Sequence, residues 1–87
     1  MKILMKPIRM ICFFEENGIP NPIKFQYRDE EKKYITVKVD NIVNRDEEKL
    51  AGNRMFIFKC QSEDGDVIKI YELKYEINTC KWFLFKM

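Results

Sequence analysis

Hydrophobic and polar residues alternate along most of the chain with a period of two, which is the pattern of half-buried β-strands. The alternation is clearest over residues 23–28 and 34–40, where every second residue is apolar. Denser apolar runs predict four further strands, at residues 7–15, 54–61, 67–77 and 81–87. Six short strands of this kind are typical of a small all-β domain.

Turn signals separate these strands. Asn17-Gly18 and Asp64-Gly65 favour the positive φ angles of tight hairpins, and the charged stretch 29–33 is expected to be a solvated turn. Strands joined in this way predict a small antiparallel barrel or a strongly coiled sheet, similar in size to an SH3 domain. Closure into a barrel is the preferred prediction because it removes exposed sheet edges.

One segment is expected to be helical. Residues 45–51 carry acidic side chains at positions 46–48 and end before Gly52, which predicts a short helical turn near residues 46–51. Asn44 or Asp46 would cap its start. Such a turn is too short to be stable alone and would need to pack against the strands.

The length of the chain predicts one small β domain over residues 1–87, because chains divide into separate cores only well beyond this size. Residues 1–5 precede the first predicted strand and are expected to form a loose N-terminal extension. Aromatic residues make up 14% of the sequence, which supplies the large side chains that a thin core requires.

Cysteine usage and hydropathy predict a cytoplasmic protein with no membrane partner. The three cysteines are odd in number and widely spaced, whereas small secreted domains usually carry paired cysteines. No run approaches the roughly 18 apolar residues that cross a membrane. The start of the chain is interrupted by charge and by Pro7, unlike a signal peptide.

The residue types exclude the familiar enzyme classes. Histidine is absent, which removes the usual general base near neutral pH and the commonest metal ligand. Ser62 is the only serine, so no serine–histidine pair can form, and the three glycines stand too far apart for a phosphate-binding loop. We therefore predict a protein that is not an enzyme, with no catalytic residue and no cofactor.

Two groups of residues invite a metal-binding interpretation. Cys12, Cys60 and Cys80 fall in the even phase of their strands and could supply three thiolates, but buried cysteines usually behave as small hydrophobic residues. The acidic group at 63–66 lacks the ligand spacing of a calcium loop and fits a solvated turn instead. A further acidic group, Asp46, Glu47 and Glu48, could be read as paired catalytic acids but fits a helix N-terminus. No metal site is predicted.

A possible nucleic-acid face lies on the strands predicted at 23–28 and 34–40. If these strands pair as a hairpin, basic side chains and one aromatic ring share an exposed surface, as in small barrels that hold single strands. The alternative is an ordinary solvated face, because the net charge of the whole chain is only +2. The residues concerned are Lys24, Gln26, Arg28, Tyr34, Thr36 and Lys38.

A possible protein interface is the second candidate. The first strand and the last strands carry more apolar residues than one sheet face can bury, and a contiguous apolar surface usually marks an interface. The alternative is that strong coiling of the sheet or the turn at 46–51 covers these residues. The residues concerned are Ile11, Phe13, Ile68, Ile70, Phe83 and Phe85.

Several stretches resemble short proteins of unassigned function from clostridia and related bacteria. They are residues 21–27, 49–54 and 71–76, together with Trp82-Phe83-Leu84. A second pattern is similar to a small β-rich domain found near bacterial lesion-bypass polymerases, and it consists of Tyr71, Leu73, Thr79, Trp82 and Leu84. Neither resemblance implies an activity or a functional residue.

These observations predict a non-catalytic binding or assembly module that associates with itself, as a possible homodimer, or with another protein through an apolar sheet face. The alternative prediction is weak binding of single-stranded nucleic acid through the basic and aromatic face.

Overall fold

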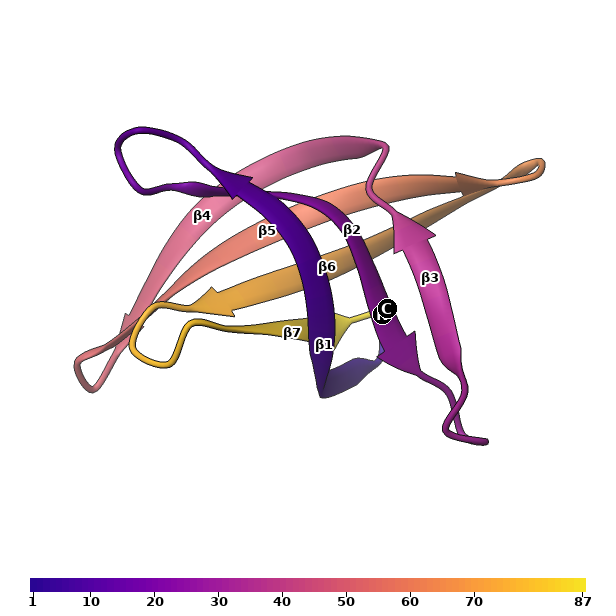
Figure 1. Ribbon diagram of the computed structural model, residues 1–87, viewed down its shortest axis with the longest axis horizontal. Coiled ribbons are helices and arrows are strands. Elements are labelled where there is room, and N and C mark those ends of the chain that lie inside the picture. The colour runs from indigo at the N-terminus through magenta and orange to yellow at the C-terminus, as the bar shows by residue number, and fades with distance from the viewer.

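The computed structural model describes all 87 residues, and it confirms an all-β fold built from antiparallel strands. Seven strands, one more than predicted, form a single sheet in the order β3-β2-β1-β7-β6-β5-β4 (Figure 1). Their bounds are β1 (Ile3–Phe14), β2 (Pro20–Arg28), β3 (Tyr34–Lys38), β4 (Asn41–Leu50), β5 (Asn53–Asp64), β6 (Val67–Glu76) and β7 (Lys81–Lys86).

The sheet folds back on itself because β1 is shared between two layers. Its first half, residues 3–8, pairs with β7, and its second half, residues 9–14, pairs with β2. The register with β7 is irregular between Ile3 and Lys6, where Met5 adopts a positive φ of 45°. As a result β1, β2 and β3 cross over β4–β7 in Figure 1, and the two layers enclose the core.

The core lies between the layers and is mainly aromatic. Phe25 of β2 meets Tyr71 of β6 with their ring centroids 5.5 Å apart, and the ring centroids of Tyr75 and Trp82 are 5.0 Å apart with the rings inclined by 47°. Burying such rings supplies most of the apolar area that a small domain can remove from water. The buried cluster is Phe25, Phe58, Cys60, Tyr71, Leu73, Tyr75, Trp82 and Leu84.

The predicted closure into a barrel is wrong, because β3 and β4 remain unpaired edges of an open, strongly coiled sheet. The edges are protected by other means. β3 has only five residues, and β4 is rich in charged residues and carries an irregularity between Ile42 and Asn44. Short length, charge and bulges are the usual devices that prevent edge-to-edge aggregation.

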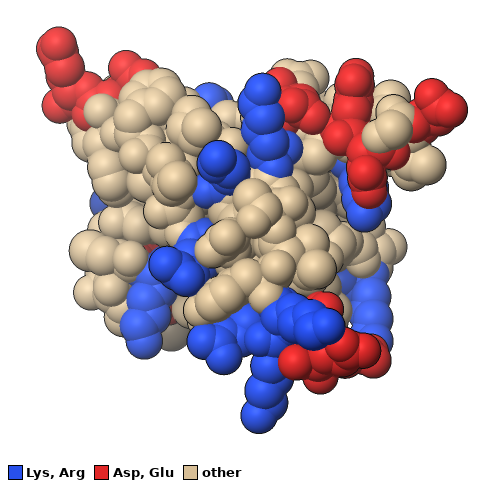
Figure 2. Space-filling view, turned by 45° about the vertical axis from the view of Figure 1, so that its right-hand side comes forward, with Lys and Arg blue, Asp and Glu red and all other residues tan.

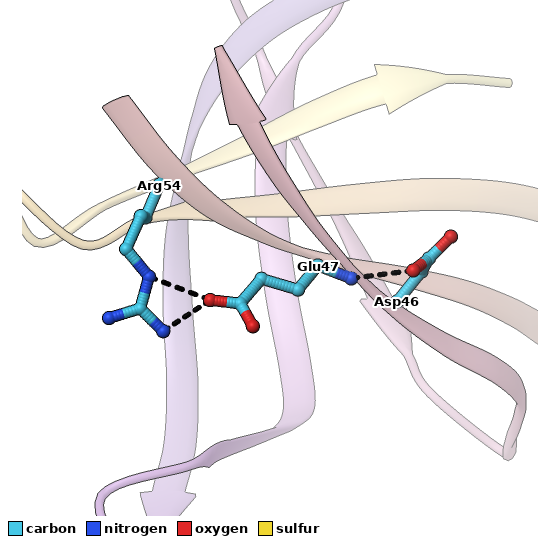
Figure 3. Close-up of polar contacts among 3 residues, drawn as sticks. All are labelled: Asp46, Glu47 and Arg54. Atoms are coloured by element: carbon cyan, nitrogen blue, oxygen red, sulfur yellow. Dashed lines mark hydrogen bonds and ion pairs between the residues drawn. The ribbon is translucent and has the colours of Figure 1, made fainter. Parts of the chain in front are cut away.

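The predicted helical turn near residues 46–51 is also wrong, because this segment is the second half of β4. It pairs with β5 down to Leu50 opposite Asn53, and Ala51 and Gly52 form the connecting turn with φ angles of 50° and 82°. Both Nε and Nη2 of Arg54 donate hydrogen bonds to Oε1 of Glu47 across the two strands (Figure 3). The charges that suggested a helix therefore belong to an edge strand.

Residues 3–5 were expected in a loose extension, but they belong to β1, and the N-terminal residues are paired with the C-terminus. The amide of Lys2 donates to the carbonyl of Met87 at 3.0 Å, and the amide of Met87 donates to the carbonyl of Lys2 at 3.1 Å. The two termini accordingly lie together in Figure 1. The structure contains no helix with the length and apolar character needed to cross a membrane.

Candidate nucleic-acid interface

The β2–β3 hairpin brings the six predicted nucleic-acid residues onto one face. Residues directly opposite each other in an antiparallel pair project to the same side of the sheet. Phe25 and Val37, the pair on the other side, face the core. The outward pairs are Lys24 with Lys38, Gln26 with Thr36, and Arg28 with Tyr34.

A seventh residue, Arg9 of β1, joins this face because it is paired with Gln26. Arg9 is not among the residues predicted for this face from the sequence. Its place could have been found, since the Asn17-Gly18 turn predicts a hairpin between the first two strands. In such a hairpin the outward residues of both strands lie side by side.

Tyr34 lies close to two guanidinium groups. Nη2 of Arg28 donates a hydrogen bond of 2.9 Å to the Tyr34 hydroxyl. The guanidinium carbons of Arg28 and Arg9 lie 4.8 Å and 4.9 Å from the centre of the Tyr34 ring. The Arg28 hydrogen bond, followed by that of Arg9, lowers the pKa of Tyr34 because both favour the anionic phenolate.

Two shallow hollows lie along β1 and β2. One has a volume of about 370 Å³ and the other about 530 Å³, and they share Arg9 and Gln26. The first also takes in Lys24 and Thr36. The second takes in Lys6, Arg28, Asp29 and Tyr34, among others. We refer to the two hollows together as the basic groove.

Charge is segregated onto this layer, although the whole chain is nearly neutral. The strands β1, β2 and β3 contain five basic residues and no acidic residue. Since the chain has sixteen basic and fourteen acidic residues, acids outnumber bases in the remainder. Figure 2 shows basic side chains in a band across the surface, with acidic side chains gathered at its corners. The net charge of the whole chain therefore does not reveal the positive charge that is concentrated on β1, β2 and β3.

The six predicted interface residues do not form one patch. Ile11 and Phe13 are 62% and 51% exposed, near the β1–β2 turn. Ile68 and Ile70 are 60% and 43% exposed, beside the β5–β6 turn, and Figure 1 places the two turns at opposite ends of the molecule.

Phe83 and Phe85 lie on the outer face of β7, next to β6, and both are half-buried. The ammonium group of Lys74 lies 3.7 Å from the centre of the Phe85 ring. It also donates a 3.0 Å hydrogen bond to Glu48. The lysine stem and its ion pair therefore cover part of the apolar surface that was predicted to be an interface.

The three cysteines occupy three different environments and do not gather into a common group. Cys60 is buried in the core, where burial raises the pKa of its thiol to about 12. Cys12 is half-buried in β1. Cys80 lies exposed in the turn after β6, with a φ of 59°, rather than on a strand. The Cys60 thiol is thus protonated at neutral pH and packs as a small hydrophobic side chain.

Comparison with protein-family models, with curated proteins and with solved structures finds no match to this chain. The two resemblances in the sequence therefore stay predictions. What can be inferred about function depends on the basic groove and on the exposed apolar residues.

Proposed function

We propose that this protein is a binding module for single-stranded nucleic acid and that the basic groove holds the sugar-phosphate backbone. The observation that carries the proposal is the alignment of Arg9, Lys24, Arg28 and Lys38 on one face of three strands that contain no acidic residue. Positive groups that follow a strand direction match the repeat of phosphates along an extended strand.

Polar and aromatic groups between the cations support the same ligand. Gln26 donates a hydrogen bond of 3.0 Å to Thr36, so the amide and hydroxyl form a fixed polar centre in the hairpin. Tyr34 is 42% exposed and offers a ring edge and a hydroxyl beside the guanidinium planes. Arginine planes and aromatic rings are the usual stacking surfaces for unpaired bases. The proposed function is non-catalytic. We also propose that the protein is cytoplasmic.

Binding should be weak and sensitive to salt. Four basic side chains that each neutralise one phosphate give an expected slope of log K against log salt of about −3 for a single strand. The measurement is fluorescence anisotropy of a labelled mixed-sequence 12-nucleotide strand, as DNA and as RNA, titrated with protein at several low salt concentrations.

The variant Lys24→Glu with Arg28→Glu should abolish binding, and its matched control is Lys49→Glu with Lys59→Glu. Both control lysines are exposed and lie on β4 and β5, so the change in net charge is the same but falls outside the groove. Equal loss in the two double variants would mean that only net charge matters. Absence of binding by the unmodified protein at low salt would refute the proposal.

Self-association is a second candidate function, favoured by the exposure of Ile11, Phe13, Ile68 and Ile70. The surroundings of the two pairs are complementary in charge. The first pair adjoins Lys24, which is opposite Ile11 in the register, and the second adjoins the acidic turn 63–66. A contact between the two ends of neighbouring copies would cover both apolar pairs.

A further inference from the structure

The second hollow of the basic groove has more positive charge than an internal phosphodiester requires. Three basic residues, Lys6, Arg9 and Arg28, and one acidic residue, Asp29, line its roughly 530 Å³ volume, which leaves a net charge of +2. An internal phosphate of a nucleic-acid strand carries one negative charge, whereas a terminal phosphate monoester carries between one and a half and two at neutral pH, as phosphorylated side chains do. The charge of the hollow therefore matches a chain end better than a chain middle.

The hydrogen-bond donors of the hollow are arranged around Tyr34. Its oxygen accepts a hydrogen bond of 2.9 Å from Arg28, so the phenolic proton is free to donate to a ligand. The guanidinium of Arg9, on β1, lies 4.9 Å from the centre of the Tyr34 ring. It presents further N–H groups to the same hollow. Paired guanidinium groups are well suited to phosphate oxygens, because their donors bind in a planar, bidentate manner.

An acidic turn closes this end of the groove. Asp29 lines the hollow, and its Oδ1 accepts hydrogen bonds of 2.9 Å from the amides of Glu31 and Lys33, which hold the carboxylate in place. Glu30 adds a second acidic group, Lys33 is paired with Glu31 at 3.3 Å, and with Lys32 the turn has a net charge of −1. A strand that continued past Arg28 would bring its next phosphate against these carboxylates, and like charges repel.

The basic face is also short. From the pair formed by Lys24 and Lys38 to the pair formed by Arg28 and Tyr34 the strands advance by four residues. At ~3.3 Å per residue this is about 13 Å, room for only a few nucleotides. A short groove with one closed, strongly basic end favours a ligand that terminates there.

We propose that the hollow formed by Lys6, Arg9, Arg28 and Tyr34 is a seat for a terminal phosphate monoester, so that the groove holds the phosphorylated end of a single strand. This inference rests on the proposed nucleic-acid function and names the part of the strand that is recognised. The 5′-phosphate and the 3′-phosphate share the chemistry that the seat requires.

The experiment compares three labelled hexanucleotides of one mixed sequence: one with hydroxyl groups at both ends, one with a 5′-phosphate and one with a 3′-phosphate. Affinity is measured by anisotropy at a single low salt concentration, with the label on an internal base. One phosphorylated strand should bind about tenfold more tightly than the hydroxyl strand, and which one does so identifies the end that enters the seat.

Variants separate the seat from the rest of the groove. Arg9→Gln and Arg28→Gln should each reduce the tenfold preference to about twofold or less, and Tyr34→Phe should reduce it by a smaller factor. Lys24→Gln is the matched control because it removes one positive charge from the first hollow. It should weaken all three strands by the same factor and leave the preference intact. Thermal melting of each variant verifies that the fold is retained.

The outcomes distinguish the two proposals. If the three strands bind equally well to the unmodified protein, the phosphate seat is refuted while the nucleic-acid function stands. A preference that survives both Arg9→Gln and Arg28→Gln also refutes the seat. If no strand binds, both proposals fail together.

Discussion

At the scale of single residues, the most informative polar contact in the core joins the two layers. The Ser62 hydroxyl lies 2.5 Å from the carbonyl oxygen of Lys38 and 2.5 Å from the buried Tyr71 hydroxyl. The carbonyl can only accept, so the single Ser62 proton goes to Lys38 and Tyr71 donates to Ser62. Ser62 is therefore the hydrogen-bond partner of two groups, the carbonyl of Lys38 at the end of β3 and the buried hydroxyl of Tyr71.

This arrangement predicts different costs for two small deletions. Ser62→Ala leaves the Tyr71 hydroxyl and the Lys38 carbonyl without their partner and should lower the free energy of unfolding by about 2–3 kcal/mol. Tyr71→Phe leaves Ser62 bonded to Lys38 and should cost only about 1 kcal/mol. Urea denaturation of both variants measures the difference, and equal costs would contradict the assigned donor directions.

Alkaline stability follows from the same buried groups. Burial raises the pKa of Cys60, of Tyr71 and of Tyr75 to about 12 in each case, above the ordinary values of 9.0 for cysteine and 10.0 for tyrosine. Between the ordinary and the raised pKa the unfolded chain has lost the proton and the folded chain retains it. The stabilising contribution is therefore complete below about pH 9 and declines as the pH rises toward 12.

We expect the free energy of unfolding to fall above pH 9, with each group adding at most about 1.4 kcal/mol per pH unit. Urea denaturation at half-unit steps from pH 7 to pH 11.5 measures the slope. Cys60→Ala should reduce the part of the decline that begins near pH 9, to which Cys12 also contributes because burial raises the pKa of its thiol, and retain the part that begins near pH 10. A flat profile in the unmodified protein would show that these groups titrate normally.

The sequence predicted several residue-scale features correctly because they depend on local alternation. The six outward residues of β2 and β3 share a face as predicted, since the register follows from the turn between them. Arg9 was missed because its place depends on the pairing of β1 with β2, which was not used in predicting the face. This pairing brings Arg9 beside Tyr34, 25 positions further along the chain.

At the scale of elements, β4 explains the largest error of the sequence prediction. Its charged residues resemble a capped helix turn, and intrinsic preference could not distinguish that from an exposed edge strand. The decisive information is tertiary. β5 offers an unpaired edge, and Ala51-Gly52 can reverse the chain with positive φ at both positions. A two-residue turn of this kind matches the twist of the strands that it joins.

A substitution in the turn after β4 distinguishes the observed edge strand from the helical turn predicted near residues 46–51. Ala51 has a φ of 50°, a conformation that asparagine tolerates better than alanine. Ala51→Asn should therefore stabilise the protein by roughly 1 kcal/mol and raise its melting temperature by about 4–8 °C. In a helical segment the same change would be destabilising, because alanine is the better helix former.

Differential scanning calorimetry measures the shift, and Gly52→Ala is the matched control. Gly52 has a φ of 82°, so adding a side chain there should lower the melting temperature even though nothing lies within 4 Å of the position that its Cβ would occupy. A lower melting temperature for Ala51→Asn would contradict the hairpin.

At the scale of the whole molecule, the sequence predicted the all-β class but not the way the sheet is completed. Hydrophobic content in both phases of the first strand predicted that it is at least half-buried on both faces, but one of its faces, which includes Ile11 and Phe13, is exposed. β1 belongs to both layers and bends between them, and only its alternate residues face the core. Nothing local distinguishes such a folded sheet from a closed barrel, because the difference lies in whether β3 and β4 meet.

The open sheet also sets the geometry of any self-association. Ile11 and Phe13 lie near one end of the molecule, in a basic layer, and Ile68 and Ile70 lie near the other end, beside acidic residues. Two different patches that bind each other make a heterologous contact, which forms chains or rings rather than a closed dimer. The number of copies in an assembly should therefore keep increasing as the protein concentration rises.

Two double variants test this geometry by sedimentation velocity. Ile11→Thr with Phe13→Thr, and Ile68→Thr with Ile70→Thr, should each sediment as a monomer at concentrations where the unmodified protein associates. Threonine retains the preference for strands, so the fold is expected to persist. An equimolar mixture of the two variants should recover dimers and nothing larger, because one intact patch remains on each variant. If one variant alone still associates as the unmodified protein does, the contact is made by a single patch with itself, and the heterologous geometry is wrong.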